Sequence, residues 1–206
     1  MWLLNVLSIL SFVCLPPAGE EGVIVDSAQI FEQAMEGTSA PDDIVRAMRL
    51  IDVEYYGFDD RLHRGQMVVH KDLAEEVVEI FGEIRRMRFP IEMTIPIKFD
   101  LPDNGTTMDT LNNTMSFHYR VISTFKTEKL SYHAYGTAID INPYQNPAIL
   151  KSGRVIPEGA AYDPAAKGTL TRESEVVKLF LRYGWEWGGT WRSLKDYMHF
   201  EKRLTQ

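Results

Sequence analysis

The stretch LSYHAYGTAIDIN, residues 130–142, places one histidine and one aspartate among small, aromatic and apolar residues. Its second half has the pattern of a short strand that carries Asp140, and successive side chains of a strand point to opposite faces. His133 precedes Asp140 by seven residues, and Gly136 between them permits a bend of the backbone. The side chains of His133 and Asp140 can therefore converge if the chain folds back at Gly136.

A second histidine with an acidic neighbour lies in KDYMHFE, residues 195–201. Two histidines and one carboxylate are a common ligand set for a catalytic zinc ion, whose fourth position is left to water. His133, Asp140 and His199 would supply that set, and Asp196 would lie close enough to take a proton from the water. A histidine beside aromatic residues is also often purely structural, so the spacing alone leaves both interpretations open.

The length and the net charge of the chain limit the number of domains and the kind of partner that we expect. Its 206 residues suffice for one domain with a full core and are few for two. The formal net charge is −7, whereas proteins that bind nucleic acid usually present a basic patch, so we expect no nucleic-acid partner. We expect a monomer.

The first residues, MWLLNVLSILSFVCLPPAG, form an apolar segment of residues 1–19. This length suits a signal peptide and is too short to span a bilayer comfortably. The segment has no basic residue, however, since the first one in the chain is Arg46. We expect an exported protein, found in the periplasm, the cell wall or the medium, or tethered to a membrane if the segment is not cleaved. Cleavage after residue 18 or 19 would remove Cys14, the only cysteine, and with it any thiolate ligand or nucleophile.

The remaining pattern predicts one α+β domain over residues 41–206, after a spacer or weak helix over residues 20–40. Apolar residues recur at helical spacing over residues 71–89, and a second helix is predicted over residues 171–184 with Thr171 as its N-cap. The sequence pattern predicts six strands, at residues 53–58, 64–70, 93–100, 115–122, 138–141 and 196–202. Short turns and long loops join them, which favours a largely antiparallel sheet. The other histidines, at positions 63, 70 and 118, are expected on the surface or in loops.

Two motifs resemble those of a known family. SYHAYGTAID matches the Ser-x-His-x-x-Gly-x-Ala-x-Asp motif of the zinc peptidases that include D-alanyl-D-alanine carboxypeptidases, vancomycin-resistance dipeptidases and phage L-alanyl-D-glutamate endopeptidases. DYMHFE resembles their closing motif, and WEWGGTW resembles the aromatic-glycine segment before it. The resemblance extends over about residues 45–203. It implies the fold of the Hedgehog and DD-peptidase proteins, a single domain with a mostly antiparallel central sheet flanked by helices.

The resemblance also implies roles for individual residues. His133, Asp140 and His199 would bind one zinc ion per chain, and Asp196 would be the catalytic base. Arg120, in SFHYR, would face the site, where a fixed guanidinium can stabilise the negative charge that develops on an amide oxygen. Two further assignments are weaker. Ser131 would bind substrate or orient the site unless it only forms a turn, and Glu201 would hold a ligand imidazole unless it is a surface residue at the strand edge.

The function implied is a zinc metallopeptidase that acts on the peptide stems of bacterial peptidoglycan. The sequence does not decide between cleavage of the D-Ala-D-Ala bond and cleavage of the L-Ala-D-Glu bond. Vancomycin-resistance members carry Glu where this chain has Asp196, which weighs slightly against a pure dipeptidase. The alternative is a zinc-containing binding domain without hydrolytic activity, but the presence of Asp196 together with Arg120 favours an enzyme.

Overall fold

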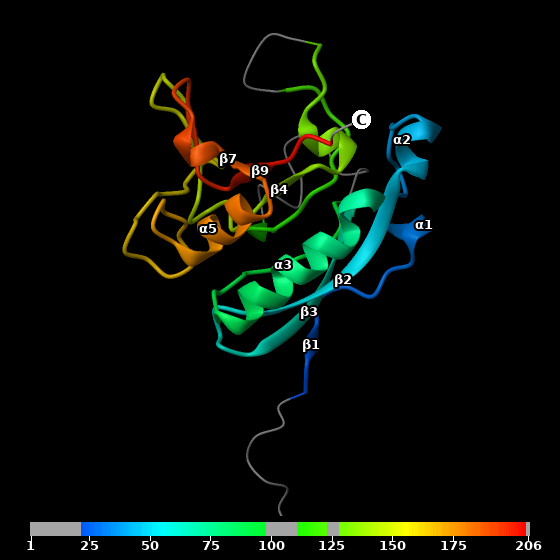
Figure 1. Ribbon diagram of the computed structural model, residues 1–206, viewed down its shortest axis with the longest axis horizontal. Coiled ribbons are helices and arrows are strands. Elements are labelled where there is room, and N and C mark those ends of the chain that lie inside the picture. The colour runs from blue at the N-terminus through cyan, green and yellow to red at the C-terminus, as the bar shows by residue number, and fades with distance from the viewer. Residues whose placement is uncertain (1–21, 98–110, 123–127, 205–206) are drawn as a thin grey trace, which may run out of the picture.

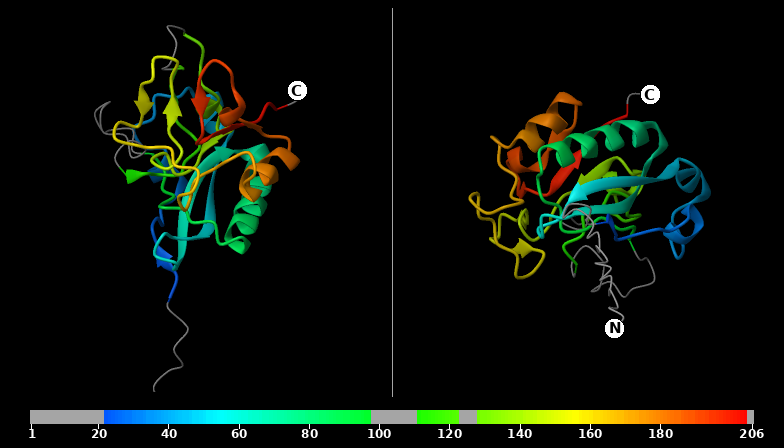
Figure 2. Two further views of the ribbon diagram at one scale, coloured as in Figure 1. Left: turned by 90° about the vertical axis from the view of Figure 1, so that its left-hand side faces the viewer. Right: turned by 90° about the horizontal axis from the view of Figure 1, so that it is seen from below.

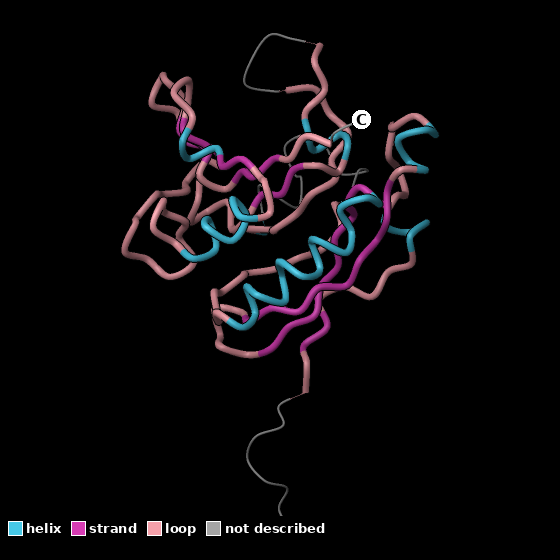
Figure 3. The backbone as a smooth tube through the Cα atoms, viewed as in Figure 1, coloured by secondary structure: helices cyan, strands magenta, loops and turns pink. Residues whose placement is uncertain are grey.

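The computed structural model describes residues 22–97, 111–122 and 128–204, which form an α+β structure (Figures 1 and 3). The expected signal peptide and all of residues 101–110 lie outside the described residues. No helix in the described part of the chain combines the length and the apolar character needed to cross a bilayer. The predicted α+β class is confirmed by this mixture of helices and small sheets.

The first sheet is a long hairpin with one helix packed on it. Strands β2 (Met48–Tyr56) and β3 (Leu62–His70) pair in antiparallel register, and β1 (Ile24–Val25) adds to β3 in parallel. The chain then passes through the short helix η1 (Lys71–Leu73) into α3 (Ala74–Arg86). The apolar face of α3 is fully buried, as the helical spacing predicts. Figure 2 shows α3 lying across one face of this hairpin.

The segment predicted as a spacer or weak helix, residues 20–40, contributes to this layer. Besides β1, it forms helix α1 (Phe31–Ala34), and helix α2 (Asp42–Arg46) follows. Ala34 and Met35 are buried against Met48 and Val68. From residue 24 onward the segment is therefore part of the domain.

The second half of the chain builds two further small sheets and one helix. Their elements are η2 (Tyr132–Tyr135), β4 (Ala138–Asp140), β5 (Ala148–Ile149), β6 (Val155–Ile156), α5 (Glu175–Arg182), β7 (Glu186–Trp187), η3 (Gly188–Thr190), β8 (Lys195–Asp196) and β9 (His199–Glu201). The strand orders are β4-β9-β7 and β6-β5-β8, and all of these pairs are antiparallel. A single central sheet is thus not confirmed, because the described residues form three sheets of three strands each.

Several predicted boundaries differ from the observed ones. The described residues of the segments 93–100 and 115–122 form only isolated bridges, such as Met93 with Asn113 and Met115 with Asp140. Helix α5 begins after Ser174 rather than Thr171, because the Ser174 hydroxyl accepts a hydrogen bond from the Thr171 amide, 2.8 Å away, in a turn that precedes the helix. These segments are held by contacts distant in sequence, which local patterns do not contain.

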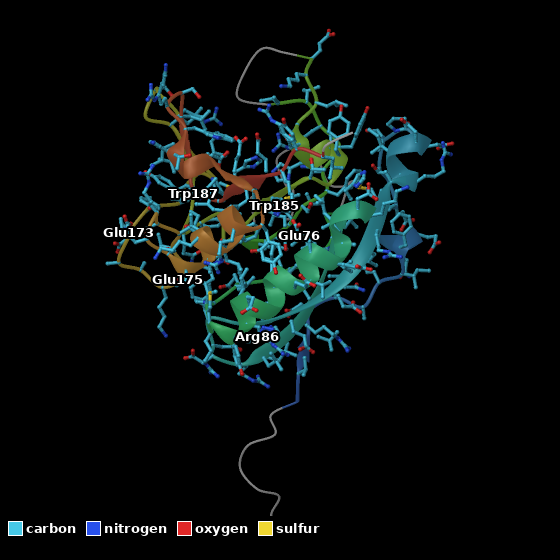
Figure 4. The ribbon with its side chains drawn as sticks, viewed as in Figure 1. Glu76, Arg86, Glu173, Glu175, Trp185 and Trp187 are labelled. Carbon is cyan, nitrogen blue, oxygen red and sulfur yellow. The ribbon has the colours of Figure 1, made fainter. Side chains whose placement is uncertain are left out.

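One core joins the two halves of the molecule. It contains Phe81 of α3, Phe180 of α5 and Phe200 of β9, and the rings of Phe180 and Phe200 stack at 4.0 Å. At its edge, Nε1 of Trp185 donates to a carboxylate oxygen of Glu76 at 2.7 Å (Figure 4). Strand β9 is therefore fixed both to its own sheet and to the helix of the first layer.

Candidate metal and active site

The three predicted ligands come from adjacent elements of the second half. In the pairing of β4 with β9, Asp140 lies directly opposite His199. His133 lies on η2, where its amide donates to the Ser131 hydroxyl at 3.3 Å. Gly136 ends η2 in the left-handed conformation, with φ +61°, and turns the chain toward β4. The bend predicted at Gly136 therefore does bring His133 back to Asp140.

The ligand atoms of these side chains converge on one point. The Asp140 carboxylate lies 2.9 Å from Nδ1 of His199 and 3.1 Å from Nε2 of His133, and the two nitrogens are 3.1 Å apart. One possible ligand atom from each of the three residues lies within 4.8 Å of the other two. The exposed fractions are 1% for His133, 3% for Asp140 and 7% for His199. Two imidazoles and a carboxylate with this convergence fit the donor set of a zinc ion.

The outer nitrogen of each imidazole is held by a second contact. Nδ1 of His133 donates to the carbonyl oxygen of Ser116 at 2.6 Å, and Nε2 of His199 lies 3.2 Å from a carboxylate oxygen of Glu201. Such contacts place the imidazole proton on the outer nitrogen and leave the inner nitrogen as a ligand. Glu201 therefore contacts the imidazole of His199, the residue that the resemblance implies as a ligand.

Burial and charge act in opposite directions on the pKa values of this cluster. Burial disfavours the ionised carboxylate of Asp140, but its contacts with His133 and His199 hold its pKa well below the usual range. Burial also disfavours the charged form of His199, yet hydrogen bonds to Asp140 and Glu201 raise its pKa to about 10. For His133, burial is the main effect and lowers the pKa. Without a metal, the cluster thus holds one anion and one cation side by side.

Asp196 and Arg120 lie on the walls of the cleft that opens over these ligands. The cleft has a volume of about 290 Å³, and Asp140, His199, Ser131 and Glu201 also line it. Oδ1 of Asp196 is buried and makes no hydrogen bond to any residue that the structure describes. Burial raises the pKa of Asp196 to about 7. All of the predicted site residues except the more deeply placed His133 therefore border one cleft.

The structure adds residues that the sequence did not single out. The carbonyl group of Ser116 belongs to the backbone, so no side-chain pattern could have indicated it. The ring of Trp191 lies 5.3 Å from that of His199, at the end of the WEWGGTW segment. His118 lies in a loop, as expected, but it is partly buried: its amide bonds to the His133 carbonyl at 3.0 Å, and burial lowers its pKa to about 4.

Comparisons with known proteins point to the same segment of the chain. Residues 125–202 match a family model described as D-alanyl-D-alanine carboxypeptidase. Over 71 residues, 34% of this chain, the sequence is 39% identical to the peptidoglycan L-alanyl-D-glutamate endopeptidase CwlK of Bacillus subtilis (strain 168). The match spans 38% of the length of that relative. No solved structure matches the chain significantly.

The segment matched by the family model contains His133, Asp140, Asp196 and His199, whereas Arg120 lies before it. The resemblance inferred from the two motifs is thus confirmed by an independent comparison. Residues 125–202, which supply most of the residues that line the cleft, are therefore similar to the D-alanyl-D-alanine carboxypeptidase family of peptidases.

Proposed function

We propose that the protein is a zinc-dependent peptidase that hydrolyses peptide bonds in the stems of bacterial peptidoglycan. One observation carries the proposal: the convergent polar atoms of His133, Asp140 and His199 lie beside a cleft that Asp196 and Arg120 also line. The family match and the peptidoglycan endopeptidase relative support the substrate class.

The proposed mechanism divides the work among named groups. When bound, zinc supplies a Lewis acid that polarises the scissile carbonyl group and lowers the pKa of water. Asp196 accepts the proton of the attacking water and transfers it to the departing amine, which converts a poor leaving group into a good one. The Arg120 guanidinium stabilises the negative charge that grows on the carbonyl oxygen. Glu201 and the Ser116 carbonyl keep the two imidazoles in their ligand orientation.

The contacts around Asp196 fit this role. Its buried and unpaired Oδ1 atom has an unmet capacity to accept a proton or hydrogen bond. A pKa of about 7 also lies near the value at which a general base works best at neutral pH. Neither feature is expected of an aspartate that only stabilises the fold.

Purified peptidoglycan, digested with the zinc-loaded protein and analysed by mass spectrometry, tests the proposal directly. We expect released fragments that end at either the L-Ala-D-Glu or the D-Ala-D-Ala bond, and the fragment masses identify which. His199→Ala should lose both most of its zinc and the cleavage. Zinc retention without any cleavage by the wild-type protein would instead favour a binding domain.

We also propose that the protein is exported, on the basis of the apolar residues 1–19. Export would place the cleft in the compartment that contains peptidoglycan. N-terminal sequencing of protein from the native host should find a mature start near residues 19–21. An intact Met1 in a cytosolic fraction would contradict export.

A further inference from the structure

We infer that a second hollow, the aromatic groove beside the cleft, binds sugar rings of the glycan strand to which the stem peptides are attached. The groove has a volume of about 430 Å³, and the aromatic residues that line it are Tyr162, Trp187 and Tyr197. The inference rests on the proposed peptidase function and specifies its substrate, because it makes stem peptides attached to glycan better substrates than free ones.

The aromatic groove and the cleft adjoin along two stretches of backbone. In strand β8, Lys195 lines the groove and Asp196 lines the cleft, since successive side chains of a strand point to opposite faces. At the end of η3, Thr190 lines the groove and the next residue, Trp191, lines the cleft. Only one layer of chain therefore separates the two hollows, and a polymer that passes over this edge can contact both.

Stacked rings form the centre of the groove. The rings of Tyr162 and Tyr197 lie 3.6 Å apart with an interplanar angle of 6°, and the ring of Trp187 lies 6.0 Å from that of Tyr197. The Tyr162 hydroxyl donates to the Leu170 carbonyl at 2.8 Å. Nε1 of Trp187 donates to the Tyr197 carbonyl at 2.8 Å. With its hydroxyl already bonded, the half-buried Tyr162 offers the groove mainly the apolar part of its ring.

Charges of both signs surround this stack. Arg172, Glu173 and Lys195 line the groove. Burial, the neighbouring Tyr197 and the carboxylate of Glu173 raise the pKa of Tyr162 to about 12, so the ring stays neutral and the carboxylate acts close to it. Glu173 would repel an anion, and Arg172 and Lys195 would repel a cation. A neutral hydroxyl group can donate to the carboxylate and accept from the cations, so the groove fits a neutral polyhydroxylated ligand.

A sugar ring has both features that the groove requires. One face of a pyranose ring carries mainly C–H groups, which pack on the electron-rich face of an aromatic side chain. Its edge carries hydroxyl groups, which form hydrogen bonds with charged side chains. The glycan of peptidoglycan is a chain of such rings joined to the stem peptides that the cleft is proposed to hold. The two adjoining hollows therefore fit the two parts of one polymer.

The first test measures binding without catalysis. The probe is a soluble oligosaccharide of chitin, which is neutral and carries no peptide. NMR titration of the zinc-loaded protein should shift the ring signals of Tyr162 and Tyr197 and leave those of the exposed Tyr135 unchanged. Because the probe is neutral, its Kd should change by less than about twofold between low and high salt. Failure to bind, or shifts confined to residues of the cleft, would overturn the subsite.

Two substitutions of Tyr162 separate the ring from its hydroxyl. Tyr162→Ala removes the stacking face and should raise the Kd for the oligosaccharide about three- to tenfold, whereas Tyr162→Phe keeps the ring and should stay within about twofold of wild type. Equal Kd values for Tyr162→Ala and Tyr162→Phe would overturn the stacking role.

A second position keeps the test decisive if Tyr162→Ala unfolds. Arg172→Gln removes a charged donor at an exposed position of the groove and should raise the Kd about two- to fivefold. Arg182→Gln, which removes the same charge from an exposed position of α5 outside the groove, is the matched control and should bind like wild type. No difference between these two variants would count against the subsite.

The last test compares two substrates of the proposed enzyme. On soluble peptidoglycan fragments that keep their glycan strands, Tyr162→Ala should raise KM about three- to tenfold and leave kcat nearly unchanged. On a free stem peptide, both constants should equal those of wild type. Equal losses on both substrates would place Tyr162 in the peptide site and overturn the glycan subsite. If the wild-type protein cleaves neither substrate, the proposed peptidase function fails, whereas the oligosaccharide titration still decides on the subsite.

Discussion

Asp196 can be separated from the metal ligands by one substitution. Asp196→Asn keeps the size and polarity of the side chain but removes its ability to take a proton. We expect zinc content near that of the wild type and a loss of at least ~10²-fold in kcat on peptidoglycan peptides, because general-base catalysis contributes about 10²- to 10⁴-fold. Metal analysis and a peptide hydrolysis assay measure the two quantities. Loss of zinc would make Asp196 a ligand, and full activity would remove it from the mechanism.

Glu201 contacts His199, one of the proposed zinc ligands, so its substitution should act on zinc affinity. In Glu201→Gln the amide oxygen still accepts a hydrogen bond from Nε2 but carries no charge, and we expect about tenfold weaker zinc binding in a competition assay with a chelating dye. Glu186→Gln is the matched control, because Glu186 is the cross-strand partner of Glu201 and is exposed. Equal affinities for the two variants would show that the Glu201 contact does not tune His199.

Zinc binding should also release protons. The pKa of His199 is raised to about 10 in the metal-free protein, so this imidazole carries a proton at neutral pH that a metal must displace. Because fewer protons must be displaced at higher pH, the apparent zinc affinity rises as pH increases toward that pKa. Calorimetry at pH 7 in two buffers of different ionisation enthalpy should find about one proton or more released per zinc ion. A buffer-independent enthalpy would mean that the inner nitrogen of His199 is already free.

The turn at Gly136 requires glycine both for its backbone conformation and for the space around it. A Cβ atom there would lie 2.6 Å from the amide nitrogen of His70 and 2.7 Å from Sδ of Met48, in a left-handed conformation. We expect Gly136→Ala to lower the free energy of unfolding by at least about 1–3 kcal/mol and to weaken zinc binding through His133. Gly82→Ala in α3 is the control with opposite sign, since nothing lies within 4 Å of its Cβ position and alanine favours a helix by about 0.5–1 kcal/mol. Urea unfolding measures both, and a stable Gly136→Ala would show that the turn can relax.

The elements that were predicted correctly have apolar residues that recur at regular spacing in the sequence. Helix α3 repeats buried apolar residues at helical spacing over its 13 positions. The described parts of segments 93–100 and 115–122 were predicted as strands because they are apolar. The chain instead uses them as single bridges, with the Asn113 side chain bonding both the amide and the carbonyl of Ile95 at 2.9 and 2.8 Å. Side-chain hydrogen bonds that take the place of backbone pairing between strands leave no periodic pattern in the sequence.

The two halves of the protein are linked at one polar cluster. Nζ of Lys202, just after β9, donates to both carboxylate oxygens of Glu76 at 2.8 and 2.7 Å and to the Tyr183 carbonyl at 2.6 Å, and Trp185 shares the same carboxylate. Glu76→Gln leaves this ammonium group without its counter-charge, so we expect the free energy of unfolding to fall by about 1–3 kcal/mol. The exposed Glu75 of the same helix turn gives the control Glu75→Gln, expected within about 0.5 kcal/mol of wild type in urea unfolding. Equal effects would show that the cluster is only a solvated ion pair.

The site was more predictable than the architecture around it. Its proposed ligands lie in two short motifs, so His133, Asp140 and His199 could be named before their positions were known. The sequence could not show that His199 presents Nδ1 while His133 presents Nε2, because that choice depends on Glu201 and on the Ser116 backbone.

The pairing of Asp140 with His199 joins residues 59 positions apart. A metal ion held by both would act as a cross-link that closes a long loop, and closing such a loop removes conformational freedom mainly from the unfolded chain. Metal that binds only the folded chain also shifts the folding equilibrium by mass action. Removal of the ion by a chelator would therefore lower the free energy of unfolding, and the resistance of the protein to proteolysis would follow its metal content.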